Sequence, residues 1–464
     1  MAKKACHSEL VSETNKGGES LPLARTSLLA TPSSGGHPRN APDSTPIETP
    51  YELPEGWKWE ITSNLADVFT GNSINETVKK EKYTGITEGL NFIGTKDVDF
   101  DGTINYENGV KISDYENFKT VPANTPLLCI EGGSAGKKLG ITSEQVCFGN
   151  KLCAFVCKNV NPKLVYYYLQ SNAFFYSFMK ERHGLIGGVS VGTLKNIPFP
   201  LPPTLAEQQR IVNRIETMFE KLDQAQEKAQ VVLDSFETRK AAILHKAFTG
   251  ELTANWRKEN GVADDSWEEK LFDSCIAKMQ NGISKRSGSE GEETVVLRLA
   301  NIGENDFDVS DLRTIKLTSK EQDNYSLTRD DVVMIRVNGS KTNVGRQILV
   351  KNNNGWSFCD HIIRIKYETF CMPSYMVYFS HTKEYKDYVQ DNMVSSAGQN
   401  TISRKGLSNL TLKIPSLPEQ QEIVRILDNV LEKETRAKEA AGQVLEQIAL
   451  LKKSILARAF RGEL

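Results

Sequence analysis

The sequence lacks the features that mark membrane and secreted proteins. It has no signal peptide, no apolar run of about 18 residues or more, and no Cys-x-x-Cys pair among its 8 cysteines. We therefore expect a cytoplasmic protein with reduced thiols. Cys147, Cys153 and Cys157 are closely spaced, but no histidine cluster completes a zinc pattern, so we predict buried thiols and no metal site.

The chain also lacks an excess of charge of either sign. The chain has Lys+Arg 57 and Asp+Glu 59, which gives a formal net charge of -2. It lacks the global positive field of many nucleic-acid-binding proteins, so any such binding must come from local basic patches.

Catalytic motifs are absent as well. Asn196-Ile197-Pro198-Phe199 lacks the second proline of the Asn/Asp-Pro-Pro-aromatic motif of DNA amino-methyltransferases. The stretch 131–138 is similar to a phosphate loop, but Glu131 replaces its first glycine and Lys138 replaces its Ser/Thr. No convincing nuclease constellation is present. We predict no catalytic residues and no cofactor bound by this chain.

What the sequence does contain is a long internal duplication. Residues 207–252 return at a constant offset of 212 as residues 419–464, without insertion or deletion and with 20 of 46 positions identical. A period of this length is too long for a solenoid repeat of roughly 20 to 50 residues. The chain is therefore a tandem of two domain-sized halves.

Both copies carry apolar residues spaced alternately three and four apart, which is typical of a coiled coil. Each predicts a helix of about 40 residues, roughly 60 Å long. Because the two share a register, we expect them to pair antiparallel with approximate two-fold symmetry. Gly250 and Gly462 stand where the helices should end. The predicted seam includes Ile211, Ile215, Met218, Leu222, Phe236, Ile423, Leu427, Val430, Val444 and Ile448.

A segment of about 150 residues without a helical pattern precedes each helix. Each segment opens on a tryptophan-containing stretch that leads to Gly71 or Gly282. Each then has an apolar strand, 126–131 or 331–336, followed by a loop rich in Gly and Ser. We predict two related α+β domains with diverged surfaces.

These residues resemble the specificity subunit of Type I restriction-modification systems. The resemblance covers about residues 51 to 464, and it rests on Leu53-Pro54-Glu55-Gly56-Trp57, the two Glu-Gln-Gln-x-Ile-Val starts and the two Ala-Phe-x-Gly-Glu-Leu ends. It implies target-recognition domains at 51–205 and 267–417 and conserved spacer helices at 206–252 and 418–464. A linker at 253–266 lies between the halves, and a flexible N-terminal arm occupies 1–50.

The resemblance further implies a protein that reads DNA without cutting or methylating it. Each recognition domain would read one half of a split double-stranded target, and the helix pair would set the gap. Two methyltransferase subunits holding S-adenosylmethionine would dock on the helices, and two motor-nuclease subunits would join for restriction.

Candidate DNA contacts come from the chemistry of side chains in corresponding loops. Glycine lets backbone amides approach phosphates while lysine supplies charge, Asn or Gln fits adenine, and Arg or Lys fits guanine. The stretches Gly187–Ser190 and Ala397–Asn400 also correspond in position. The candidates are Ser134, Lys137, Lys138 and Lys195 in the first domain, and Arg336, Asn338, Ser340, Lys341, Gln399, Asn400, Arg404 and Lys405 in the second. Further basic pairs are Lys79-Lys80, Arg182-His183 and Lys285-Arg286.

Two alternatives stay open on the residues alone. A symmetric coiled-coil adaptor would recruit two copies of a partner without reading DNA. A stand-alone methyltransferase with degenerate motifs would bind S-adenosylmethionine by itself.

Overall fold

The computed structural model describes residues 51–181 and 187–464. The predicted N-terminal arm, residues 1–50, and the candidates Arg182 and His183 lie outside the described residues. The fold is α+β, with two domains and a pair of long helices.

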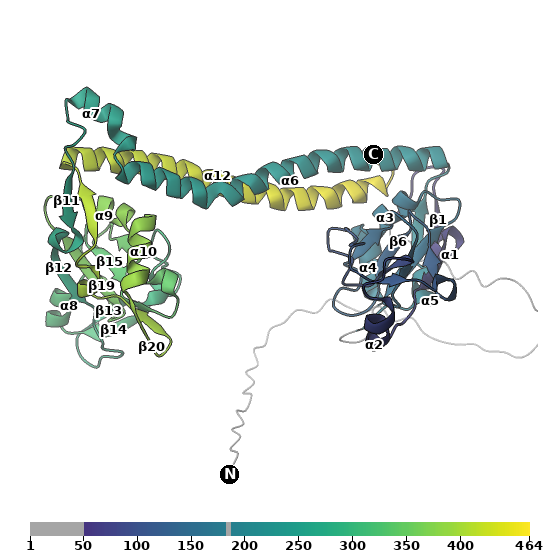
Figure 1. Cartoon of the computed structure of the whole chain (residues 1–464), viewed down its shortest axis with the longest axis horizontal. Coiled ribbons are helices and arrows are strands. Elements are labelled where there is room, and N and C mark those ends of the chain that lie inside the picture. The colour runs from purple at the N-terminus through teal and green to yellow at the C-terminus, as the bar shows by residue number, and fades with distance from the viewer. Residues whose placement is uncertain (1–50, 182–186) are drawn as a thin grey trace, which may run out of the picture. The chain divides into compact units, whose positions relative to one another are not determined.

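The two long helices lie side by side and run antiparallel (Figure 1). They are α6 (Leu205–Phe248, 44 residues) and α12 (Leu417–Ala459, 43 residues). Lys452, near the end of α12, pairs with Asp223 of α6 at 2.5 Å. Arg239, near the end of α6, pairs at 2.8 Å with Glu434 of α12, the polar residue that interrupts the heptads.

Local signals define the helix ends. The Thr204 hydroxyl accepts a hydrogen bond from the backbone N–H of Glu207 at 3.1 Å, which caps the start of α6. Gly250 and Gly462 have φ values of +84° and +72°, a left-handed conformation that glycine adopts without strain. The helices therefore end where the sequence predicts.

Most predicted seam residues are buried or half-buried. Ile211, Ile215, Phe236, Ile423, Leu427 and Ile448 are buried, and Met218, Leu222 and Val430 are half-buried. The prediction that Val444 lies in the seam is wrong, because Val444 is 37% exposed and the neighbouring Leu445 is half-buried instead. The heptad register thus shifts by one residue in α12 between Ala441, which is buried, and Ile448.

The first domain contains ten strands within the described residues 51–181 and 187–204. They are β1 (Lys58–Ile61), β2 (Ala66–Thr70), β3 (Leu90–Ile93), β4 (Lys111–Ile112), β5 (Thr120–Val121), β6 (Pro126–Cys129), β7 (Leu139–Ile141), β8 (Val146–Phe148), β9 (Leu152–Cys157) and β10 (Pro198–Leu201). Its helices are α1 (Thr62–Leu65), α2 (Glu76–Val78), α3 (Pro162–Leu169), α4 (Asn172–Lys180) and α5 (Val191–Lys195), with short π and 3-10 segments η1 (Lys79–Tyr83) and η2 (Tyr115–Asn117).

The second domain follows η3 (Glu251–Thr253) and α7 (Ala254–Asn260). Its strands are β11 (Glu268–Leu271), β12 (Ile276–Asn281), β13 (Glu292–Leu297), β14 (Thr314–Leu317), β15 (Val332–Ile335), β16 (Val337–Asn338), β17 (Gln347–Leu349), β18 (Ser357–Phe358), β19 (Ile362–Tyr367), β20 (Val394–Ser396), β21 (Gln399–Thr401) and β22 (Thr411–Ile414). Its helices are α8 (Ser319–Tyr325), α9 (Pro373–Phe379), α10 (Lys383–Asn392) and α11 (Arg404–Leu407), with 3-10 turns η4 (Phe272–Cys275), η5 (Leu299–Asn301) and η6 (Lys341–Asn343).

The two domains share one sheet plan. The order β2-β9-β6-β7 in the first matches β12-β19-β15-β17 in the second, and each domain has a two-stranded sheet, β1-β10 or β11-β22. Each also has one parallel pair, β3 with β8 or β13 with β18. The second domain adds the three-stranded sheet β16-β21-β20.

The close approach of neighbouring backbone explains why glycine occupies positions 71 and 282. A Cβ atom on Gly71 would lie 1.9 Å from the backbone oxygen of Phe148, and one on Gly282 would lie 2.2 Å from that of Cys359. Only glycine fits where these strands cross so closely.

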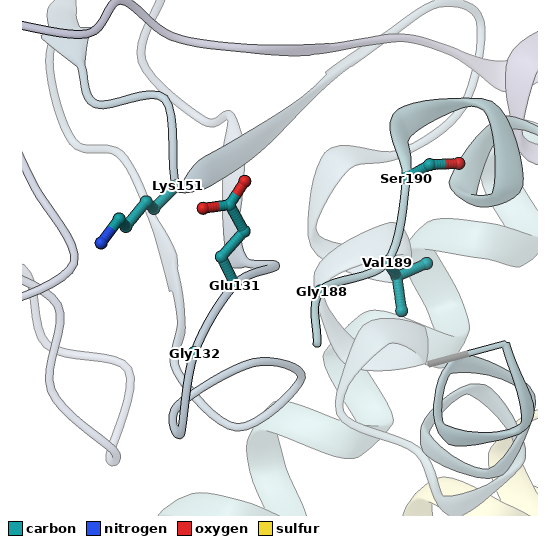
Figure 2. A pocket seen from close by; sticks show the side chains of 6 residues that line it. All are labelled: Glu131, Gly132, Lys151, Gly188, Val189 and Ser190. Carbon is teal, nitrogen blue, oxygen red and sulfur yellow. The ribbon is translucent and has the colours of Figure 1, made fainter. Parts of the chain in front are cut away.

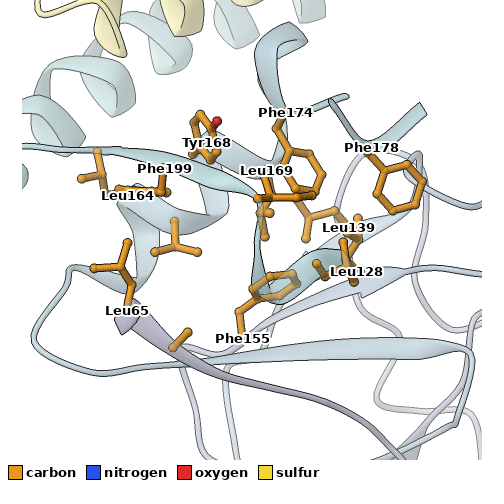
Figure 3. Close-up of a cluster of buried hydrophobic side chains, with 14 of the residues drawn as sticks. Leu65, Leu128, Leu139, Phe155, Leu164, Tyr168, Leu169, Phe174, Phe178 and Phe199 are labelled. Atoms are coloured by element: carbon orange, nitrogen blue, oxygen red, sulfur yellow. The ribbon is translucent and has the colours of Figure 1, made fainter. Parts of the chain in front are cut away.

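The repeated Ala-Phe-x-Gly-Glu-Leu motif anchors each helix end in a domain core. Phe460 packs against Tyr168 with ring centroids 5.1 Å apart, in the first-domain cluster of Figure 3, where Tyr168, Phe174 and Phe199 lie close together. Phe248 packs against Tyr375 of the second domain at 4.9 Å. Each domain therefore holds the start of its own helix and the end of the other helix.

Within the described residues, no helix combines the length and apolar character needed to cross a membrane.

Candidate nucleic-acid interface

The Gly/Ser loops leave equivalent strand ends in the two domains. The backbone N–H of Gly136 bonds to the oxygen of Cys129 at 2.8 Å, and that of Gly345 bonds to the oxygen of Ile335 at 2.9 Å. These bonds close each loop beside the end of β6 or β15. We call residues 131–138 the first loop and residues 337–343 the second loop.

Another segment lies beside each loop, but its alignment needs a correction. Val189 N–H bonds to Ile130 O at 3.1 Å, and Ile402 N–H bonds to Arg336 O at 3.0 Å, so Val189 corresponds to Ile402. The stretch Gly187–Ser190 therefore matches residues 400–403 rather than 397–400. Ile197 and Leu410 accept equivalent bonds from Thr62 and Phe272, and counting back from them gives the same match, since both pairs are 213 residues apart.

The first loop presents two lysines in different ways. Lys137 is exposed, whereas Lys138 donates to Thr95 O at 3.2 Å and lies 5.0 Å from the centre of the Phe100 ring. The backbone oxygen of Ser134 accepts from the N–H of Lys137 at 3.0 Å, which sets the turn. Lys195 ends α5 and is exposed. It lies near enough to oppose the effect of burial, which raises the pKa of the Cys153 thiol to about 12.

The second loop is held by its own polar side chains. Asn338 Oδ1 accepts from the backbone N–H of Ser340 at 2.9 Å, and the Ser340 and Thr342 hydroxyls lie 2.9 Å apart. Lys341 is exposed at the start of η6. The guanidinium of Arg336 is half-buried and lies 3.5 Å from Asp360 O. Lys341 is therefore freer to meet a ligand than Asn338 or Ser340.

Asn400 differs from its neighbour Gln399. Asn400 is 6% exposed, donates to Gly339 O at 2.9 Å and accepts from the Ser395 hydroxyl at 2.6 Å. Its amide is thus occupied in joining the hairpin to the second loop, which corrects the expectation that it reads bases. Gln399 lies at the hairpin end and is exposed.

Several basic candidates already have acidic partners. Arg404 Nε lies 2.5 Å from Asp273 Oδ1, and this hydrogen bond raises the pKa of Arg404. Arg286 pairs with Asp360 at 2.8 Å, and Lys285 pairs with Glu321 at 2.9 Å. Lys405 is exposed beside Arg404.

Cys359, Asp360 and His361 are the one group among the described residues whose ligand atoms come close enough to hold a metal. The Asp360 carboxylate, however, is engaged by Arg286 at 2.8 Å and lies 3.3 Å from His361 Nδ1. Burial raises the pKa of the Cys359 thiol, which disfavours the thiolate that a metal needs. This donor set is therefore poorly suited to a metal ion.

The predicted buried thiols are found in the first domain. Cys147 and Cys153 are buried and Cys157 is half-buried, and all are free. Burial raises the pKa of Cys147 to about 11 and that of Cys157 to about 12.

A family model described as the Type I restriction modification DNA specificity domain matches residues 54–233 and again residues 271–447. The chain belongs to this family. Membership makes it a sequence-recognition subunit rather than an enzyme.

Individual relatives agree with this family. The chain is 29% identical over 436 residues to the Type I restriction enzyme StySPI specificity subunit of Salmonella potsdam, covering 89% of this chain and 90% of the relative. It is 26% identical over 439 residues to the EcoKI specificity subunit of Escherichia coli (strain K12), with the same coverage of 89% and 90%.

Solved structures share the fold. A chain from work on complex assembly and conformational transition of the type I R-M system superimposes with a TM-score of 0.66 at 16% identity, covering 89% of this chain and 100% of that chain. The HsdS subunit from Thermoanaerobacter tengcongensis gives a TM-score of 0.59 at 17% identity, covering 90% and 100%.

Sequence reasoning missed two features of this specificity subunit. One is a pocket of about 370 Å³ in the first domain, which Glu131 and Lys151 line (Figure 2). The other is the helix α7 inside the expected linker 253–266, whose Arg257 is buried against Glu419 at 2.7 Å. The duplication aligns Lys151 with His361 at the start of the corresponding strand, but it does not show that the Gly188 segment forms a pocket with Glu131.

Proposed function

We propose that this specificity subunit reads a bipartite double-stranded DNA target, with one half-site for each α+β domain. The observation that carries the proposal is the pair of equivalent loops, one in each of two duplicated domains. Each domain is packed on a different end of an antiparallel helix pair. A two-fold arrangement of readers matches two half-sites on a duplex.

The helix pair is suited to set the gap between half-sites. Helices of 44 and 43 residues at 1.5 Å per residue are about 65 Å long, compared with about 34 Å for one turn of DNA. The seam and the inter-helix ion pairs resist sliding of one helix along the other.

Contacts to DNA divide by chemistry. Lys137, Lys195, Lys341 and Lys405 are exposed and fit phosphate contacts, which position the protein without specifying sequence. Gln399 and Arg336 fit base edges in the major groove. The loop geometry is maintained by Ser134, Asn338, Ser340 and Asn400. Lys138 is bonded to Thr95. Arg404 can contact DNA only if its ion pair with Asp273 opens.

DNA and the methyltransferase and restriction subunits are the partners that the family implies. We propose two methyltransferase subunits docked on the helix pair, each holding S-adenosylmethionine, and two motor-nuclease subunits in the restricting complex. The specificity subunit itself would hold no cofactor and would work in the cytoplasm. The proposed limits are those of the sequence: recognition domains at 51–205 and 267–417, helices at 206–252 and 418–464, a linker at 253–266 and an arm at 1–50.

The decisive test is single-molecule sequencing of DNA from a host that expresses the neighbouring methyltransferase with and without this chain. We expect a methylated motif of two short blocks around a fixed gap, present only with this chain. Methylation that persists without the chain, or a complex that forms but never methylates, would favour a coiled-coil adaptor.

Two variants test the division of labour. Exchanging residues 51–205 for another recognition domain should change one block only. Inserting one helical turn after Ala229 should change the gap and leave both blocks unchanged. A change in both blocks after the exchange, or an unchanged gap after the insertion, would contradict the modular model.

A further inference from the structure

The first domain has a pocket that combines charges of opposite sign. Glu131 and Lys151 come from one wall, and Gly188, Val189 and Ser190 come from the other (Figure 2). Glu131 directly follows Ile130 at the start of the first loop, and Lys151 leads into β9. Both charged side chains are exposed, so a ligand can reach them.

Neither charge is used elsewhere in the part of the chain that the structure describes. Glu131 and Lys151 are absent from the ion pairs and side-chain hydrogen bonds of residues 51–181 and 187–464, although Arg286, Lys285 and Arg404 of the second domain all have carboxylate partners. An unpaired acid beside an unpaired base suits a ligand that offers both a donor and an acceptor.

The corresponding place in the second domain is built differently. Val337 stands where Glu131 does, and it is buried because β16 pairs with β21, with Val337 opposite Thr401. His361 stands in place of Lys151, since the backbone N–H of Arg336 bonds to His361 O as that of Ile130 bonds to Lys151 O. The charged pocket therefore belongs to one of the two duplicated domains.

Backbone packing sets the shape of the pocket. A Cβ atom at Gly188 would lie 2.7 Å from Ile130 O and 3.0 Å from Glu131 Cγ, so only glycine fits there without moving that wall. Lys138, Glu131 and Lys151 all lie close enough to Cys129 to act on its thiol. Burial raises the pKa of the Cys129 thiol, the positive charges of Lys138 and Lys151 oppose this, and Glu131 adds to it.

We propose that Glu131 and Lys151 read a single C·G base pair in the half-site of the first domain. The Glu131 carboxylate would accept a hydrogen bond from the cytosine N4 amino group, and the Lys151 ammonium would donate to guanine O6 or N7. Across the major groove, a C·G pair presents this donor beside these acceptors. Lys137, in the same loop, would hold the adjacent phosphate. The inference rests on the proposed function and adds the identity of one base pair.

The test uses the complex of this full chain with its methyltransferase. First, motif mapping gives the half-site that the first domain reads, as defined by the domain exchange. Binding is then measured for duplexes that carry each single base-pair change in that half-site, with wild type, Glu131→Gln and Lys151→Met. We expect one C·G pair at which wild type discriminates by roughly ten-fold or more. Each variant should bring that ratio close to one, and Glu131→Gln should gain relative affinity for A·T because glutamine suits adenine.

Matched controls make the same changes of charge on α7. Lys258→Met and Glu259→Gln alter exposed residues outside both recognition domains and should leave every ratio unchanged. A variant that weakens binding to all duplexes equally, with discrimination retained, would overturn the proposal and leave a general electrostatic role. A wild-type half-site without a C·G pair would also overturn it. If wild type shows no sequence preference, the proposed function itself fails.

Discussion

Glu207 and Glu419 occupy the same position in the repeated helix, yet their surroundings are opposite. Glu419 is 0% exposed, accepts from the Thr253 hydroxyl at 2.7 Å and pairs with Arg257 of α7 at 2.7 Å. Glu207 is half-buried and pairs at 2.8 Å with Arg210, three residues along the same helix. Glu419 therefore links three segments of the chain, α12, η3 and α7, whereas Glu207 forms an ion pair on the surface of its own helix.

The adjacent glutamines do the same work in both halves. Gln208 Oε1 accepts from the backbone N–H of Asn161 at 2.8 Å, and Gln420 Oε1 accepts from that of Met372 at 2.7 Å. Each bond ties the start of a long helix to the start of α3 or α9. An identical residue in the two repeats therefore makes the same packing contact where the segment that it contacts is also present in both halves. Identity carries no such meaning at Glu207 and Glu419, because Glu419 pairs with Arg257 of α7 whereas Glu207 pairs within its own helix.

The largest effect is expected where each long helix enters its domain. Ile215 and Leu427 are both 0% exposed, so replacing both with Asp buries unpaired charges at the two ends and should remove more than about 4 kcal/mol of stability. Urea unfolding and solubility of the double variant would measure this. Val231→Asp with Leu450→Asp is the matched control, because these residues are 60% and 65% exposed on the same helices. A soluble, fully stable Ile215/Leu427 variant would show that the packing is misassigned.

Substitutions at the two helix ends should cost less stability, and the two losses should be unequal. Phe460 is 1% exposed and Phe248 is half-buried. Phe460→Ala should therefore cost about 3 to 5 kcal/mol, and Phe248→Ala should cost less. Thermal unfolding of the two single variants makes the comparison. Equal losses would mean that the two domains hold the motif equally well, contrary to the difference in burial.

Much of this architecture could be predicted from the sequence because it is periodic or duplicated. The heptads predicted α6 and α12, the repeated glycines predicted their ends, and the offset of 212 residues predicted two related domains. Val444 shows where periodicity fails: a one-residue register shift leaves the apolar pattern readable, although it moves the buried position to Leu445.

The candidate site was harder to predict because residue type does not show what a side chain already binds. Asn400 and Arg404 have the chemistry of DNA readers, but the first is committed to Gly339 and Ser395 and the second to Asp273. Conversely, Glu131 gave no signal as a ligand group, because only the neighbouring Gly188 segment turns its surroundings into a pocket. Long-range partners decide such roles, and they have no fixed spacing in sequence.

The contrast between the two glutamates can be tested directly. Glu419→Ala leaves the buried Arg257 with only Asp264, at 3.4 Å, as an acidic partner and should cost about 3 kcal/mol. Glu207→Ala breaks only a surface pair within one helix and should cost less than about 1 kcal/mol. Urea unfolding of both variants gives the difference. Arg257→Met with Glu419→Leu should recover much of the loss, because a buried pair is often replaceable by apolar residues. No recovery would point to the Thr253 hydrogen bond as the main contribution.

The smallest expected effect is a pH dependence of stability that comes from the second domain and has no counterpart in the first. Burial lowers the pKa of His381 to about 4, with the positive charges of Lys240 and Lys386 contributing and Glu304 opposing. Gln170 holds the corresponding place in the first domain, immediately before the residue that caps the next helix. Between its usual pKa of about 6.5 and about 4, the histidine binds a proton in the unfolded chain but not in the folded one.

Stability should therefore fall as pH drops through that interval, by at most about 1.4 kcal/mol per pH unit from this residue. His381→Gln gives the second domain the residue of the first and should flatten this part of the profile. Urea unfolding of both proteins between pH 7.5 and pH 4.5 measures the slope. Parallel profiles would mean that His381 takes up its proton equally in both states and that its half-buried position imposes no cost on the charged ring.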